Sequence, residues 1–138
     1  MKKVIILILL LLSFASAANA ANFMEIMRDD RFLIYIDTES IQDKDSYCSV
    51  WEKWIPRGKE ATEIKKELKG DVDYWMRLTA HKKDAKESQT LAMYVYMKNG
   101  RIKEFVSSNT PLSFKWKPII PGSVAEEIYD LIMHAIGY

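Results

Sequence analysis

The order of secondary-structure signals along the chain constrains its fold more than any other feature. Six segments rich in strand-forming residues come first, and one amphipathic helix follows them at the C-terminus. A run of strands followed by a helix is typical of an α+β domain, in which a helix covers the apolar face of a sheet. The sequence therefore predicts an antiparallel β-sheet of about six strands packed against a C-terminal α-helix.

The predicted strands share β-branched and aromatic residues and end at turn-forming residues. They cover residues 22–28, 31–37, 47–55, 72–81, 90–98 and 101–106. Asp29-Asp30 marks the first turn between them. The charged segment 59–69, whose Ile64 and Leu68 lie four positions apart, is compatible with either a short surface helix or a loop.

Asn99-Gly100 is the sharpest turn signal in the chain. This pair is preferred in two-residue type I′ turns, because both central residues take a positive φ. Such a turn pairs Met97 with Ile102 and Tyr96 with Lys103. The resulting register assigns the core face of the hairpin to Met93, Val95, Met97, Ile102 and Val106. It assigns the opposite face to Tyr94, Tyr96, Lys103 and Phe105.

The C-terminal segment has the signals of a capped helix. Ser123 and Glu126 are spaced as a capping box, in which each side chain accepts a hydrogen bond from a backbone N–H of the first turn. Gly137 is placed to end the helix. An apolar stripe at helical spacing follows the cap and comprises Val124, Ile128, Leu131, Ile132 and Ala135. We expect this stripe to pack on the sheet.

The N-terminus has the pattern of a cleavable secretion signal. Lys2 and Lys3 precede an apolar run at residues 4–12, and Ala18-Asn19-Ala20 forms an A-x-A cleavage motif. The run is shorter than the roughly 20 residues of a transmembrane helix. We therefore expect cleavage to leave residues 21–138 as one domain outside the cytoplasm, in the periplasm or at the cell surface. An uncleaved N-terminal anchor is the alternative.

The charge and the motif content exclude several classes of function. The chain has 20 basic and 19 acidic residues, so no bulk charge steers it to nucleic acid. It carries no sequence motif for a metal or cofactor site, and no glycine-rich phosphate loop. Cys48 is the single cysteine, and the histidines are His81 and His134. The thiol is either buried or reactive, and a Cys–His pair would require a histidine beside the strand of Cys48. We expect a protein that is not an enzyme.

Several motifs, in order along the chain, resemble the surface-adhesin protein E-like family of bacterial envelope proteins. They are Tyr35-Ile36-Asp37, Ser40-Ile41, Val50-Trp51, Tyr94, Asn99-Gly100 and Trp116-Lys117-Pro118-Ile119-Ile120-Pro121-Gly122-Ser123. The resemblance implies a small exported antiparallel sheet packed on a C-terminal helix. The namesake of the family is an adhesin that binds host extracellular-matrix and serum proteins.

The chain departs from this family in its cysteines. Members often have one cysteine near the end of the fourth strand and another near the end of the last helix. Residues 79–83 and 133–138 contain none. We therefore expect the burial of Ile128, Leu131 and Ile132 to hold the helix, since each contributes about 1.5–3 kcal/mol when fully buried.

Two groups of residues are candidates for binding a partner. The first is an amphipathic patch of Tyr94, Tyr96, Lys103 and Phe105, which would either bind another protein or bury a homodimer contact. The second is the basic turn of Lys82, Lys83 and Lys86, which would meet acidic polymers or acidic proteins. Solvated loop residues are the simpler interpretation of this turn. The leading hypothesis is an exported, adhesin-like binding module, and the alternative is a structural or housekeeping protein of the periplasm.

Overall fold

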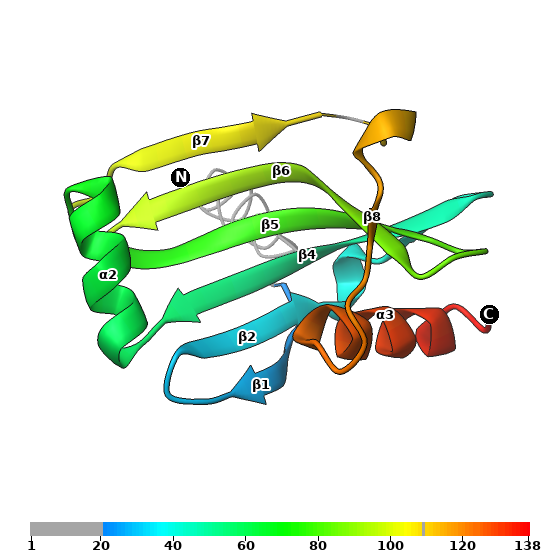
Figure 1. Cartoon of the computed structure of the whole chain (residues 1–138), viewed down its shortest axis with the longest axis horizontal. Helices are drawn as coiled ribbons and strands as arrows, with labels where there is room; N and C mark the ends of the chain where they lie inside the picture. Colours follow the sequence, from blue (N-terminus) through cyan, green and yellow to red (C-terminus); the bar gives the residue numbers. More distant parts are fainter. Residues whose placement is uncertain (1–20, 109) are drawn as a thin grey trace, which may run out of the picture.

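A single antiparallel sheet with two helices on one of its faces forms the body of the protein (Figure 1). The computed structural model describes residues 21–108 and 110–138. The expected signal peptide at residues 1–20 lies outside the described residues. Within the described part of the chain, neither helix has the length and apolar character needed to cross a bilayer.

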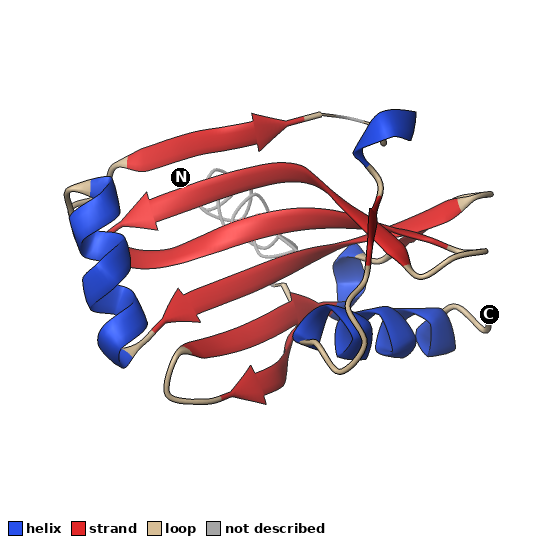
Figure 2. Cartoon of the chain, in the orientation of Figure 1, coloured by secondary structure: helices blue, strands red, loops and turns tan. Residues whose placement is uncertain are grey.

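The elements follow the predicted order (Figure 2). The strands are β1 (Phe23–Arg28), β2 (Phe32–Asp37), β3 (Gln42–Asp43), β4 (Tyr47–Pro56), β5 (Val72–Lys82), β6 (Glu87–Met97), β7 (Ile102–Ser107) and β8 (Lys117–Pro118). The helices are α2 (Gly58–Leu68) and α3 (Val124–Ala135), with short 3₁₀ turns at Thr38–Ser40 and Ser113–Lys115. The α+β fold is confirmed.

The main sheet runs β1-β2-β4-β5-β6-β7, and all its neighbours are antiparallel. These six strands are the six predicted ones. The two-residue strands β3 and β8 pair with β4 and β6. They are too short to show any periodic pattern in the sequence.

The charged segment after β4 is a helix, α2, and not a loop. Its Ile64 and Leu68 pack on a buried cluster of Val72, Val95 and Met97. The helix ends at Leu68. The capping residue after it, Lys69, adopts a left-handed conformation with φ of 53° and donates its N–H to the Lys65 carbonyl. This apolar pair, four residues apart, explains why so charged a segment folds onto the sheet.

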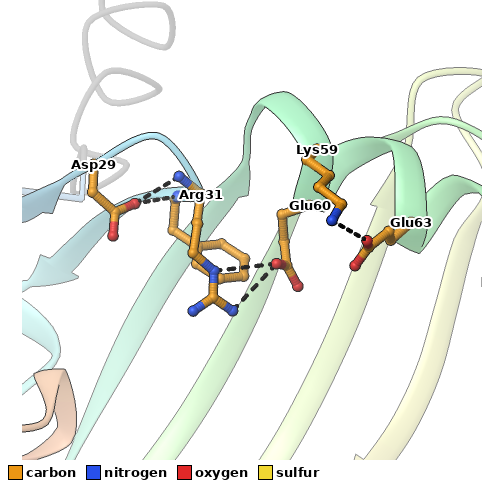
Figure 3. A network of polar contacts seen from close by, with 6 residues as sticks. Asp29, Arg31, Lys59, Glu60 and Glu63 are labelled. Atoms are coloured by element: carbon orange, nitrogen blue, oxygen red, sulfur yellow. Dashed lines mark hydrogen bonds and ion pairs between the residues drawn. The ribbon is translucent and has the colours of Figure 1, made fainter.

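Polar contacts hold the start of α2 against the β1–β2 turn (Figure 3). The Asp29 carboxylate accepts hydrogen bonds from the backbone N–H groups of Arg31 at 2.8 Å and Phe32 at 2.7 Å, which forms the expected turn. These bonds lower the pKa of Asp29. The Arg31 guanidinium then reaches Glu60 on α2 at 3.2 Å. The turn thereby positions the arginine that contacts the helix.

The capping box of α3 forms in part: Ser123 caps the helix as predicted, but Glu126 reaches Gly122, one residue before the cap. The Ser123 hydroxyl accepts from the Glu126 N–H at 3.3 Å, and the Glu126 carboxylate accepts from the Gly122 N–H at 2.7 Å. The buried stripe is Ile128, Tyr129, Ile132 and Met133, which faces Ile34, Ile36, Cys48 and Val50. Burial of Ile128 and Ile132 is confirmed. Leu131 is half-buried and Ala135 exposed, so the predicted stripe is rotated from the observed one.

The predicted type I′ turn at Asn99-Gly100 is wrong. The Met97 N–H donates to the Arg101 carbonyl at 2.8 Å, so the loop has three residues. Gly100 alone among them has a positive φ, of 83°. This is a type I turn followed by a glycine bulge. Tyr96 consequently pairs with Ile102 and Val95 with Lys103, one residue away from the expected register.

Candidate functional site

Both helices lie on one face of the sheet. Ile34, Trp54, Trp75 and Val95 form one cross-strand row. Residues directly opposite each other share a face, so this row defines the helix-covered face. Ile34 packs under α3 and Val95 under α2. Figure 1 shows α2 across one end of the strands, and α3 lies near β1 and β2.

Alternation along the strands turns a second set of residues to the opposite face. Tyr35, Lys53, Met76 and Tyr94 form a cross-strand row there. Aromatic side chains concentrate on this side. We call the following set the aromatic face: Phe23, Tyr35, Trp51, Lys53, Tyr74, Tyr94 and Tyr96. All seven side chains are half-buried, so each keeps some surface open to solvent.

The rings of the aromatic face contact one another across the strands. Tyr74 and Tyr96 stack with centroids 4.6 Å apart and an interplanar angle of 17°. Trp51 and Tyr94 lie 6.2 Å apart. Burial, with the neighbouring Tyr96, raises the pKa of Tyr74, so its hydroxyl stays protonated at neutral pH. The strands thus hold the rings in fixed positions.

Lys53 lies between Tyr74 on β5 and Phe23 on β1 and so connects the two edges of the aromatic face. Its ammonium nitrogen lies 4.4 Å from the ring centroid of Tyr74 and 5.5 Å from that of Phe23. Phe23 in turn meets Tyr35 edge to face at 6.5 Å. A cation over aromatic rings is stabilised by the negative potential of the ring faces. The aromatic face therefore continues from β1 to β6.

The structure separates the four residues of the predicted patch. Tyr94 and Tyr96 belong to the aromatic face, whereas Lys103 and Phe105 lie on the helix-covered side. The Lys103 ammonium donates to the Leu68 carbonyl at the end of α2, at 3.0 Å. Phe105 is 49% exposed and lines a shallow apolar cleft of about 330 Å³ beside α2. The physical reason is the shifted hairpin register, together with a bulge between the Met93 and Tyr94 pairings.

The lysines of the basic turn are paired with acidic residues of the chain. Lys82 bonds to Glu87 at 3.0 Å, and Lys83 pairs with Asp43. Lys86 bridges two carboxylates of α3, Glu126 at 2.8 Å and Asp130 at 3.0 Å. These pairs offset the positive charge that an acidic partner would need. Lys86 instead joins the β5–β6 turn to α3.

A cysteine and a histidine do meet in the core. Cys48 is the cross-strand partner of His81, and both are buried. Burial raises the pKa of the Cys48 thiol to about 11 and lowers the pKa of His81 to about 4. Both groups are therefore neutral near pH 7, whereas nucleophilic catalysis by cysteine uses the thiolate. The second histidine, His134, is exposed on α3.

Comparison of the chain with family models, curated proteins and solved structures finds no match in any of the three. The resemblance to the surface-adhesin family therefore depends on the sequence motifs alone.

Sequence reasoning missed most of the aromatic face. It placed Tyr94 and Tyr96 there but did not associate them with Trp51, Lys53 or Tyr74. Alternation from Val50 would have placed Trp51 and Lys53 opposite the core. Their contact with the tyrosines depends on the β4–β5 and β5–β6 registers, and β4 and β5 are separated in the sequence by helix α2.

Proposed function

We propose that this protein is an exported, non-enzymatic binding module that recognises a partner protein through the aromatic face. The observation that carries the proposal is that both helices cover the other face of the sheet. The aromatic face is left with partly exposed tyrosines, a tryptophan and a lysine. Such residues are the usual energetic anchors of protein interfaces.

Preorganisation of the rings supports this use. Each ring is already held by a neighbour, as in the Tyr74–Tyr96 stack at 4.6 Å and the Lys53–Tyr74 contact at 4.4 Å. Binding therefore orders few side chains, and the entropic cost of association is reduced. Half-exposed aromatic side chains on adjacent strands present a broad surface suited to another protein.

The expected partners are host extracellular-matrix or serum proteins. This part of the proposal follows from the secretion signal and from the motifs shared with the surface-adhesin family. The neutral, buried Cys48–His81 pair supports a role without nucleophilic catalysis, since neither group is ionised or open to a substrate.

Surface plasmon resonance against a panel of matrix and serum proteins tests the proposal. The exported protein is recovered after cleavage of its signal and compared with Tyr96→Ala and Tyr74→Ala. Each substitution is expected to weaken binding at least tenfold, because a central aromatic anchor contributes about 2 kcal/mol or more. Phe105→Ala, a half-exposed aromatic on the opposite face, is the matched control and should leave affinity unchanged. Absence of saturable binding to every member of the panel contradicts the proposal.

Two further measurements separate the alternatives. Protease treatment of intact cells should degrade a surface adhesin, whereas protection would favour a structural protein of the periplasm. Light scattering reports whether the aromatic face instead joins two copies of the chain. A dimer that Tyr96→Ala dissociates would replace the proposed partner protein with a second copy.

A further inference from the structure

A polar pocket lies at one end of the sheet, on the same side as the aromatic face. Its volume is about 490 Å³, within the range of small-molecule sites. Residues of three kinds line it. Trp51 and Leu91 supply apolar surface, Gln42 and Ser49 supply uncharged polar groups, and Glu39 and Lys44 supply opposite charges.

The wall of the pocket is fixed to the sheet. The strand β3 pairs with β4 through Gln42 and Ser49. Just before it, the Ser40 hydroxyl accepts from the Trp51 N–H at 2.9 Å and donates to the Asp37 carbonyl at 2.7 Å. The segment that carries Glu39 and Gln42 is therefore held in place before any ligand arrives, which lowers the entropic cost of binding.

Polar groups of the pocket are available to a ligand. The side chains of Gln42 and Lys44 are exposed, whereas Ser49, which also lines the pocket, is 5% exposed. Gln42 offers both a donor and an acceptor, and so does Ser49. The charges of Glu39 and Lys44 cancel, so the pocket as a whole does not favour an ion.

We propose that this pocket binds a neutral sugar residue, such as the end of a glycan. A pyranose ring carries hydroxyl groups that both donate and accept, which matches the uncharged polar groups. It also has an apolar C–H surface, which matches the indole of Trp51, because an aromatic ring face attracts weakly positive hydrogen atoms. Tyr94, at 6.2 Å between ring centroids, holds the indole in position. The pocket shares Trp51 with the aromatic face, but binding of a sugar there does not require a partner protein on that face.

Titration with named sugars tests the inference. Lactose, N-acetyllactosamine and chitobiose are added to the exported protein, and binding is followed by saturation-transfer NMR and calorimetry. We expect saturable binding of at least one of them. Gln42→Ala and Ser49→Ala should each weaken it about tenfold through the loss of one hydrogen bond in the site. Thermal unfolding of each variant establishes that the loss does not come from unfolding.

Two comparisons make the result decisive. Tyr96→Ala should leave sugar binding unchanged, while it weakens binding to a partner protein, so the two proposals fail independently. Free lysine and glutamate are the competing probes, because their opposite charges could pair with Glu39 and Lys44. Saturable binding of an amino acid in preference to every sugar would overturn the inference. So would the absence of sugar binding, or binding that neither Gln42→Ala nor Ser49→Ala weakens.

Discussion

Cys48 on β4 and His81 on β5 are direct cross-strand partners beneath α3. The Cys48 thiol donates to the His81 backbone carbonyl at 3.9 Å. The imidazole meets the ring of Tyr129 on α3 edge to face, with centroids 6.0 Å apart. Among the described residues, neither imidazole nitrogen has a hydrogen-bond partner. The pair therefore contributes packing between sheet and helix, and it makes this part of the core sensitive to protonation.

The Cys48 thiol is expected to be unreactive in the native protein. It is fully buried, and burial raises its pKa to about 11, so almost no thiolate exists at neutral pH. Ellman's reagent should react slowly with the folded protein and rapidly after addition of guanidinium chloride. Rapid reaction under native conditions would contradict the placement of Cys48 in the core.

Stability should fall with acidification because of His81. Its folded pKa of about 4 lies below the ordinary histidine value of 6.5, so the unfolded state binds more protons between these values. The stability contribution is complete above pH 6.5 and is lost as the pH falls toward 4, by about 3 kcal/mol in all. The charged groups that influence this histidine are Glu52 and Arg77 on the sheet.

Urea unfolding at several pH values measures this slope. His81→Phe should remove most of the pH dependence between 6.5 and 4.5, whatever it does to stability at neutral pH. His134, exposed on α3, is the matched control, and His134→Gln should leave the profile as in the wild type. A profile that His81→Phe does not change would show that other groups cause the acid sensitivity.

Replacing only one partner of the Glu52–Arg77 ion pair should strongly destabilise the folded protein. Glu52 is 1% exposed, and its carboxylate accepts from Arg77 at 2.7 Å and from the Trp54 indole N–H at 2.8 Å. Burial by itself raises the pKa of Glu52. The Arg77 guanidinium, His81 and the Trp54 indole N–H together more than offset this effect, so the pKa lies below its usual value. Arg77→Met is expected to lower the free energy of unfolding by about 3–5 kcal/mol, since it leaves a buried charge unpaired.

A double substitution separates charge from packing at this pair. Glu52→Gln/Arg77→Met should recover much of the stability that Arg77→Met loses, because no buried charge remains. Lys65→Met, which breaks the exposed pair with Asp71, is the control and should have little effect. Chemical denaturation of the three variants provides the comparison. Equal losses for Arg77→Met and the double variant would contradict the argument.

The stability of the β6–β7 turn should depend on Gly100 because of its backbone conformation and not because of the space around it. Its φ is 83°, and nothing lies within 4 Å of a Cβ built there. Gly100→Ala is therefore expected to cost about 1 kcal/mol through conformational strain and not through a clash. Asn99→Asp keeps the acceptor for the Arg101 N–H and should be neutral. Thermal unfolding of both variants tests this, and a neutral Gly100→Ala would contradict the positive φ.

Local sequence signals were sufficient to predict the strands and the C-terminal helix. They were insufficient to predict the register in which the strands pair. The cap at Ser123 predicted the start of α3, because a capping box requires only residues three apart. Asn99-Gly100 predicted a hairpin but not its loop length, since the same pair suits a two-residue turn or a three-residue turn with a glycine bulge. A shift of one residue changes the face of every side chain in one strand. That shift moved Lys103 to the side of α2 and Ile102 to the side of Tyr96.

The sequence by itself determined the class of fold: six strand-forming segments, then one capped helix. Periodicity, turn residues and caps act within a few positions, so they can be read locally. Only the tertiary structure decided that Trp51, Tyr74 and Tyr94 share one face and that Cys48 lies opposite His81. These relationships depend on the registers between strands, such as the one that places Cys48 opposite His81, 33 residues further along the chain. Such registers follow from the competition of many weak contacts over the whole sheet, which no short stretch of sequence records.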